Sequence, residues 1–177
     1  MVGGFTIVSP ADYDTALLRY DTNGDLDPGF GGGNGFVTTS IGPSIVGIND
    51  VTLLTDGRIL VTGSATNAST NFDIILNRYN ADGSPDTTFG GGDGIVTTPI
   101  GSGSEQGYSV AVQSDGRIIV GGQTHNGTNI DFALTRYNTD GTLDNTFGGG
   151  DGIVTTPIGP GHDFGRGVVL QLSLIHI

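Results

Sequence analysis

Residues 147–159, FGGGDGIVTTPIG, repeat residues 89–101 letter for letter, and a looser version of the same stretch occupies residues 30–42. Successive copies begin 59 and 58 residues apart. A period of this length is typical of a tandem array such as a propeller or a solenoid. The repeat, more than the total length of the chain, therefore decides the fold.

Each repeat is predicted to contain four short strands and no helix. Residues 51–59 and 110–118 each place an Asp-Gly pair between two β-rich runs. This pattern predicts a hairpin with a type I′ turn, in which both central residues have positive φ. The next run, as in residues 71–79, carries apolar groups on both faces, so we expect it between two packed layers. The last run, as in residues 95–98, ends at Pro99, which marks an outer edge strand because proline cannot donate to a ladder.

The repeat phase divides the chain into units. We predict an incomplete first repeat at residues 1–50, a second repeat at 51–109, a third at 110–167, the start of a fourth at 168–171 and a tail at 172–177. The first repeat is expected to lack its first strand. The tail resembles the translation of an adapter used in sequencing libraries, so it is excluded from the fold. We therefore expect both ends to be truncated, together with any signal peptide or anchor.

The composition excludes several classes of partner. Acidic residues outnumber basic ones 18 to 6, the formal net charge is −12, and all six basic residues are arginine. Such a surface repels phosphate backbones and anionic headgroups, so nucleic acid is not an expected partner, whereas cations are. Cysteine is absent, which excludes disulfides and thiolate metal sites and fits an exported protein. There is no apolar run of about 18 residues, so no membrane insertion is expected.

Several motifs recur in fixed order and spacing. In the third copy they are SDGRIIVGG at residues 114–122, FALTRY at 132–137, DG at 140–141 and LDNTFG at 143–148. This pattern resembles the delta-60 repeat, a bacterial β-propeller-type repeat of unassigned function, over essentially all of residues 1–171. The resemblance implies one propeller blade per repeat and occurrence in large, often exported or surface-attached bacterial proteins. It implies no catalytic residues.

The expected fold is all-β, with tandem four-stranded antiparallel blades that form an open three-blade fragment of a β-propeller. Propellers typically close with about four to eight blades, so three copies are expected to leave terminal faces exposed for neighbours. A β-solenoid, which would use the same short strands in an open stack, is the alternative.

The polar turn of the first repeat is a candidate metal site. Asp21, Asn23, Asp25 and Asp27 place a carboxylate or amide oxygen at every second position, and calcium takes about six to eight such oxygens. The other two copies have serine or threonine in place of Asp25, which leaves fewer donors. The alternative is an Asx turn, in which these side chains bond nearby backbone groups.

Arginine and aspartate recur in phase with the repeat. The positions are Arg19, Arg78 and Arg136, then Arg58 and Arg117, and finally Asp14, Asp73 and Asp131. A guanidinium fork can bind a carboxylate or backbone carbonyls in two places at once, so we predict Asp–Arg ties between adjacent blades. A catalytic role is the weaker interpretation, because an active site needs one unique cluster and these groups occur in every copy.

Uniform repetition without a unique reactive cluster favours a non-enzymatic structural or binding module of a larger bacterial protein. We expect it to be extracellular or at the cell surface. Its expected partners are neighbouring blades of the same protein and a protein or carbohydrate ligand. One alternative is a fragment of a propeller enzyme whose active site lies elsewhere in the parent. Another is a calcium-stiffened adhesin or stalk repeat.

Overall fold

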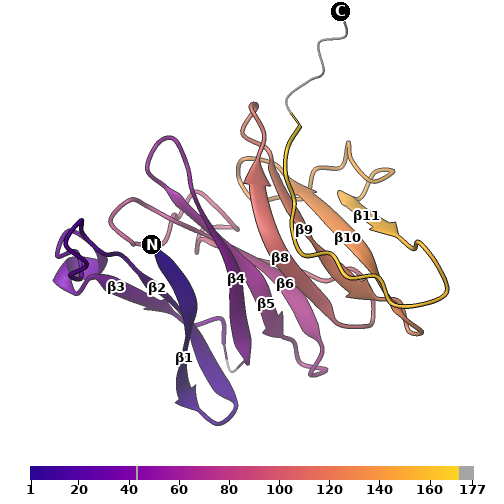
Figure 1. Ribbon diagram of the computed structural model, residues 1–177, viewed down its shortest axis with the longest axis horizontal. Coiled ribbons are helices and arrows are strands. Elements are labelled where there is room, and N and C mark those ends of the chain that lie inside the picture. Colours follow the sequence, from indigo (N-terminus) through magenta and orange to yellow (C-terminus); the bar gives the residue numbers. More distant parts are fainter. Residues whose placement is uncertain (43, 172–177) are drawn as a thin grey trace, which may run out of the picture.

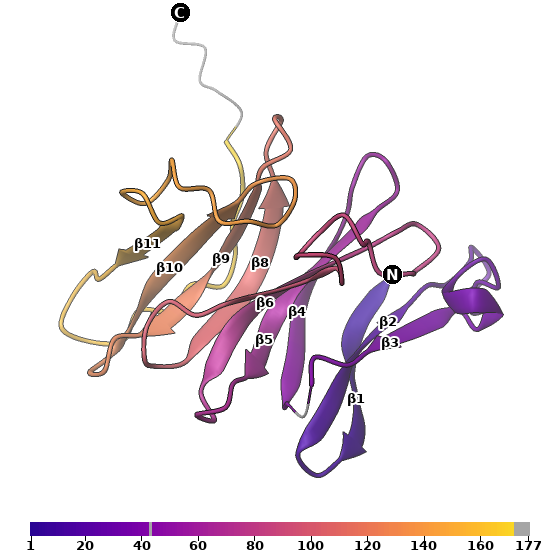
Figure 2. The same cartoon turned by 180° about the vertical axis from the view of Figure 1, so that it is seen from behind.

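The computed structural model describes residues 1–42 and 44–171 (Figure 1). Its strands, β1 to β11, form three antiparallel sheets that stand side by side in a row, and the row does not close into a ring (Figures 1 and 2). The all-β class and the open three-blade arrangement are therefore as predicted, and sheets of this kind are propeller blades rather than turns of a solenoid. The predicted tail, residues 172–177, lies outside the described residues.

Each sheet is one blade, numbered in chain order. Blade 1 consists of β1 (Val2–Ser9), β2 (Asp12–Leu18) and β3 (Phe36–Thr39); blade 2 of β4 (Val46–Leu53), β5 (Ile59–Thr66), β6 (Phe72–Tyr79) and β7 (Ile95–Thr98); blade 3 of β8 (Glu105–Val112), β9 (Ile118–His125), β10 (Ile130–Tyr137) and β11 (Ile153–Thr156). Strands that follow one another in the chain are neighbours in the sheet. Blade 1 has three strands and lacks the first one, as the repeat phase predicts.

The hydrophobic core lies between the blades. Side chains from facing sheets of blades 2 and 3 form one cluster, which contains Leu60, Ile74, Leu76, Phe89, Val110, Ile118, Val120 and Tyr137. A smaller cluster between blades 1 and 2 contains Leu17, Phe30, Ile59, Val61 and Tyr79. Strand β6 is buried along almost its whole length, which confirms that the third strand of a repeat lies between two layers. Because burying one large apolar side chain contributes about 1.5–3 kcal/mol, adjacent blades stabilise one another.

The last strand of each complete blade is an outer strand. Strands β7 and β11 pair on one side and end directly before Pro99 and Pro157. The predicted edge position of these strands is therefore confirmed.

Two details of the first hairpins differ from the prediction. Strands β4 and β8 begin several residues before Val51 and Val110, so the predicted repeat boundaries fall inside them. The turn is also not type I′, because Gly57 has positive φ (88°) but Asp56 does not. The Gly57 N–H donates to the Leu54 carbonyl at 3.0 Å, as in a type I turn followed by a left-handed glycine. Aspartate thus avoids a conformation that costs a residue with a Cβ about 1–2 kcal/mol.

The described residues contain one short 3-10 turn, Gly31–Gly33, and no α-helix. In the same part of the chain, no helix is long and apolar enough to cross a membrane. The predicted start of a fourth repeat, residues 168–171, forms no strand.

Candidate functional site

An arginine, an aspartate and a phenylalanine form the same cluster, here called the clamp, in every blade. The three clamps are Arg19–Asp27–Phe30, Arg78–Asp86–Phe89 and Arg136–Asp144–Phe147. The arginine Nε donates to the aspartate Oδ2 at 2.7, 2.7 and 2.8 Å, and its guanidinium lies 4.7, 4.3 and 4.5 Å from the ring centre. Each guanidinium is thus held by a carboxylate and stacked on an aromatic face, which lysine does not reproduce.

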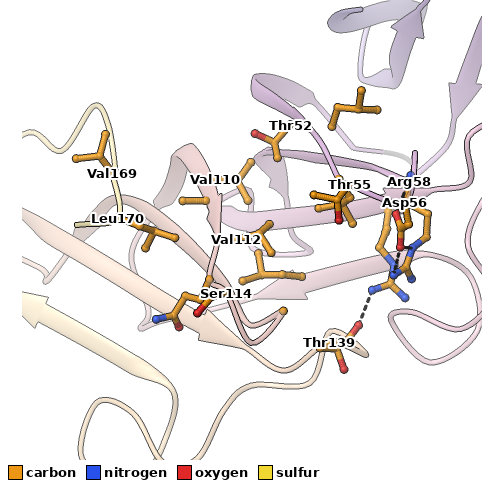
Figure 3. A pocket seen from close by; sticks show the side chains of 17 residues that line it. Thr52, Thr55, Asp56, Arg58, Val110, Val112, Ser114, Thr139, Val169 and Leu170 are labelled. Atoms are coloured by element: carbon orange, nitrogen blue, oxygen red, sulfur yellow. Dashed lines mark hydrogen bonds and ion pairs between the residues drawn. The ribbon is translucent and has the colours of Figure 1, made fainter. Parts of the chain in front are cut away.

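The clamp reaches from one blade to the next. Arg19 Nη1 donates to the carbonyl of Ala81 at 2.5 Å. Arg78 Nη1 makes the same bond to the carbonyl of Thr139, which Figure 3 marks at that residue. Backbone bonds run alongside, from the Gly31 N–H to the Asp82 carbonyl (2.8 Å) and from the Gly90 N–H to the Asp140 carbonyl (3.0 Å). The polar part of each blade interface is therefore repeated along with its core.

A turn of the next blade covers the clamp phenylalanine. Phe30 and Phe89 have no exposed surface, whereas Phe147, which no following blade covers in the described residues, is half-buried. The covering residues are Gly83 and Gly141, at φ 90° and 91°. A Cβ at Gly83 would lie 2.7 Å from a ring carbon of Phe30. Glycine is required at these turns both for its positive φ and for the space that the ring occupies.

The predicted Asp–Arg ties between adjacent blades are wrong: in the described residues, each ion pair joins an arginine to an aspartate of its own blade, and the aspartates are not the expected ones. The clamp carboxylates come from the turns that follow β2, β6 and β10. They do not come from Asp14, Asp73 and Asp131. Asp73 instead accepts a hydrogen bond from the Asn67 amide at 2.9 Å. Asp73 and Arg78 lie five residues apart along β6, which separates them by roughly 16 Å. The turn, in contrast, folds Asp86 back against Arg78, where its N–H donates to the Arg78 carbonyl at 3.0 Å.

A sequence signal for the correct partners does exist. An aspartate follows each clamp arginine by eight residues in all three copies, at Asp27, Asp86 and Asp144. The tie between blades is then the bond from the arginine to a carbonyl of the next blade. This bond depends on how the sheets stack, so no spacing of residues in the sequence predicts it.

A second arginine supports the clamp carboxylate of blade 2. Arg58 Nη1 lies 3.2 Å from Asp86 Oδ2. Burial opposes the charge on Asp86, but hydrogen bonds from Thr88, Arg58 and Arg78 outweigh it and hold the pKa of this carboxyl well below its usual value. Blade 3 repeats the arrangement with Arg117, Arg136, Asp144 and Thr146.

The turn that is predicted to bind calcium is organised by its own hydrogen bonds. Asp21 Oδ1 accepts the N–H groups of Asn23 (2.8 Å) and Asp25 (3.0 Å), which makes an Asx turn. Asp27 belongs to the clamp of Arg19. Within residues 1–42 and 44–171, no three His, Asp or Glu side chains are grouped so as to hold a metal ion. The three aspartates of the candidate site thus form no such group, and the alternative of an Asx turn accounts for the hydrogen bonds of Asp21; no observation tests calcium binding itself.

The chain's single glutamate, Glu105, is fully buried at the start of β8. Its Oε1 accepts the Thr124 hydroxyl at 3.1 Å. Burial is the largest effect on this carboxyl and raises its pKa, and the nearby charge of Asp73 acts in the same direction. A carboxyl with a raised pKa in an open cleft would be a candidate general acid. Because Glu105 has no exposed surface, we assign it to the blade interface.

A groove runs along the ends of the first strands (Figure 3). It has a volume of about 750 Å³ and is lined by the ends of β4 and β8, the turns that follow them, and Val169 and Leu170. Its walls combine apolar side chains with the hydroxyl-bearing Thr52, Thr55 and Ser114, and three charged side chains also line it: Asp56, Arg58 and Arg78. Apolar walls with a few polar groups are typical of ligand sites. Sequence reasoning missed this groove, because its walls come from successive repeats and meet only in the folded chain.

The fold and the clamps define the class of protein. Antiparallel sheets with sequential strand order, stacked face to face around shared cores, are the blades of a β-propeller.

The chain belongs to the family described as a domain of unknown function (DUF5122) β-propeller, which matches residues 2–30, 54–89 and 113–147. Each matched segment ends at a clamp phenylalanine. No curated protein matches the chain. The propeller-type repeat of unknown function is thereby established, while the name delta-60 repeat stays a prediction.

Proposed function

We propose that the chain is a structural and binding repeat module of a larger protein and not an enzyme. The observation that carries this proposal is the double role of the clamp arginine. It pairs with an aspartate of its own blade and also bonds a carbonyl of the next, at Ala81 and at Thr139. In blades 1 and 2, the recurring clamp arginine is therefore engaged in holding adjacent blades together. A stack held in this way supplies a rigid support for a binding surface.

The groove is the surface that we propose for a ligand. Its volume of about 750 Å³ lies within the range of ligand sites, about 300–1,000 Å³. Leu53 on its wall is 66% exposed, so apolar surface is available to a partner. A neutral or cationic peptide, or a carbohydrate that presents an apolar face and hydroxyl groups, suits these walls. The net charge of −12 disfavours the approach of an anionic ligand, and the two groove arginines, Arg58 and Arg78, are already paired with Asp56 and Asp86.

We propose an extracellular or cell-surface location for the parent protein. The lack of cysteine and the excess of acidic residues support it, as does the resemblance to repeats of large exported bacterial proteins. Detection of the parent in culture supernatant or on intact cells with an antibody against this chain would test the proposal. Recovery of the parent solely from the cytoplasm would contradict it.

The binding proposal is tested by immobilising the chain and passing over it a panel of neutral and cationic peptides and oligosaccharides. The groove variant Leu53→Arg is expected to weaken any ligand found by at least about tenfold, since it places a charge against an apolar wall. Ile158→Arg is the matched control, because Ile158 is 72% exposed and lies outside the groove. Equal binding by both variants would exclude the groove as the ligand site.

The non-enzymatic part is tested with hydrolase and dehydrogenase substrate panels. We expect no turnover by the purified chain. Turnover that a single substitution of a residue outside the repeated motifs abolishes, without loss of folding, would overturn it.

A further inference from the structure

A second cavity lies at the opposite end of blade 3 from the groove. The groove is lined by Ile118 at the start of β9, whereas this cavity lies where β9 ends and β10 begins. Its other wall is the linker between blades 2 and 3, at Ile100, Gly101 and Ser102. The volume of about 310 Å³ is at the lower end of the range of ligand sites, about 300–1,000 Å³. The cavity is therefore a separate site for a small group.

Asp131 contributes a buried carboxylate to the wall of this cavity. The residue is 4% exposed. Its Oδ2 accepts the Asn126 amide at 2.6 Å, whereas its Oδ1 has no hydrogen-bond partner in the described residues. None of the ion pairs in that part of the chain includes Asp131. Because a buried charge is costly unless it is paired and hydrogen-bonded, a cation that donates a hydrogen bond to Oδ1 would stabilise this carboxylate.

Two hydroxyl groups line the cavity on the same face of the sheet as this carboxylate. Thr124 is the direct cross-strand partner of Asp131, so their Cβ atoms are about 4.5–5.5 Å apart. The Thr124 hydroxyl donates to Glu105 Oε1 at 3.1 Å, which leaves its lone pairs to accept from a ligand. Thr155 pairs with Ala133, two residues after Asp131, and therefore shares the same face. The cavity thus offers a carboxylate and hydroxyl acceptors to one ligand.

Blade 2 does not have this set of acceptors. The corresponding rows of paired residues are Glu105–Thr124–Asp131 in blade 3 and Val46–Ala65–Asp73 in blade 2. Val46 and Ala65 belong to a hydrophobic cluster. Both aspartates accept an asparagine amide of the loop that precedes their strand, so this bond belongs to the repeat. The threonine and the glutamate are particular to blade 3, and the repeated bond does not account for them.

We propose that this cavity binds a primary ammonium group. Such a group is a compact positive charge that donates three hydrogen bonds, which matches Asp131 Oδ1 and the hydroxyls of Thr124 and Thr155. His125 also lines the cavity, but its Nδ1 accepts the Gly127 N–H at 3.1 Å and so carries no proton for Asp131. A metal ion suits the cavity less, because within residues 1–42 and 44–171 no three His, Asp or Glu side chains are grouped to hold one.

The ammonium group must come from another molecule, because the chain contains no lysine. Two sources share this chemistry: a free small amine, and the lysine side chain of a partner protein. The net charge of −12 favours the approach of either one.

The first test is calorimetric titration of the full chain with n-butylamine. We expect saturable binding that is at least about tenfold weaker for Asp131→Asn, which removes the charge but keeps an acceptor for Asn126. Asp73→Asn is the matched control, because it removes the same charge at the equivalent position of blade 2, and it is expected to bind like the unchanged chain. Equal losses in both variants would indicate attraction to the net charge alone and overturn the site. Absence of saturable binding by the unchanged chain up to about 100 mM amine overturns it as well.

A second variant keeps the test independent of the folding of Asp131→Asn. Thr124→Val preserves the shape of the side chain but removes one acceptor, so we expect binding to weaken about fivefold. A thermal melt of each variant identifies those that fold. Unchanged binding by a folded Thr124→Val would contradict the proposed acceptor set.

The second test compares ligands and distinguishes the two sources. Binding of a peptide with a single lysine, lost when that lysine is acetylated, would assign the cavity to a partner protein, and binding of n-butylamine without the peptide would assign it to free amines. Tetramethylammonium has the charge but no N–H donor, and it is expected not to bind. Equal binding of tetramethylammonium and n-butylamine overturns the proposal. Leu53→Arg is expected to leave amine binding unchanged, because Leu53 lines the groove and not this cavity, so the two sites are tested separately.

Discussion

The ring of Phe89 lies directly beneath Gly141 of the following blade, so that a Cβ on Gly141 would approach a ring carbon to 2.9 Å. The same relationship joins Phe30 to Gly83 one repeat earlier. Aromatic side chain and turn glycine are thus the two halves of a contact that recurs with the repeat. Two separate causes therefore require glycine at Gly83 and Gly141: the positive φ of the backbone and the close packing against the phenylalanine ring.

The first prediction concerns this contact. Gly141→Ala should lower the free energy of unfolding by about 2–4 kcal/mol, because it adds both left-handed strain and a clash with the Phe89 ring. Gly24→Ala, at the equivalent turn without a covering neighbour, should cost about 1 kcal/mol from the strain alone. Urea unfolding of the two variants provides the measurement, and equal losses would show that the ring contact contributes nothing.

The second prediction separates the bond between blades from the clamp itself. Arg78→Lys should destabilise the chain by about 2 kcal/mol or more, because lysine cannot hold Asp86, Thr88 and the Thr139 carbonyl at once. Arg136→Lys should cost about 1 kcal/mol less, since Arg136 bonds only its own blade in the described residues. The comparison is made by chemical denaturation at one pH. A larger loss for Arg136→Lys would refute the assignment of the Thr139 bond to stability.

The third prediction is acid sensitivity from Asp86. Its pKa is lowered in the folded state, so the unfolded chain takes up the proton first as the pH falls. The stability contributed by ionised Asp86 should therefore be complete above its unfolded pKa of about 3.9 and be lost progressively below it. Asp86→Asn should be less stable at neutral pH and show a shallower fall in melting temperature between about pH 4 and pH 2. Parallel curves for the two proteins would show that other groups cause the acid response.

The fourth prediction has the opposite sign. Burial raises the pKa of Glu105, so its protonated form contributes stability that is present below the usual value of 4.5 and is lost as the pH rises through the folded-state pKa. Lowering the pH through the folded-state pKa of Glu105, which lies above 4.5, should therefore stabilise the unchanged chain, and Glu105→Gln should lack this response. Because Glu105 is the only glutamate, selective carbon-13 labelling allows its carboxyl titration to be followed directly by NMR. A midpoint at or below 4.5 would contradict the assignment.

The fifth prediction concerns calcium. Asp21 is engaged by backbone N–H groups and Asp27 by Arg19, so we expect the melting temperature to be the same with millimolar calcium and with a chelator. The measurement is a pair of thermal melts, with Asp25→Asn as the matched variant. A calcium-dependent rise that Asp25→Asn removes would establish the turn as a calcium site after all.

The strand pattern was accessible from the sequence because it depends on local chemistry. Alternating apolar residues, the proline after the last strand and the Asp-Gly turns each act within a few residues. The same signals recur in each repeat, so the sequence alone was enough to predict the all-β fold class. The predicted type I′ turn failed for an equally local reason, since a type I turn with a left-handed glycine satisfies the same Asp-Gly pair.

The sequence by itself thus determined the repeat, the all-β class, the missing strand of blade 1 and the edge position of the last strands. Tertiary structure decided which aspartate pairs with each arginine, which carbonyl the arginine bonds, and which glycine covers each phenylalanine. It also assembled the groove. The physical reason is that strand formation depends on neighbours along the chain, whereas these contacts join residues of different turns or blades that only the stacking of sheets brings together.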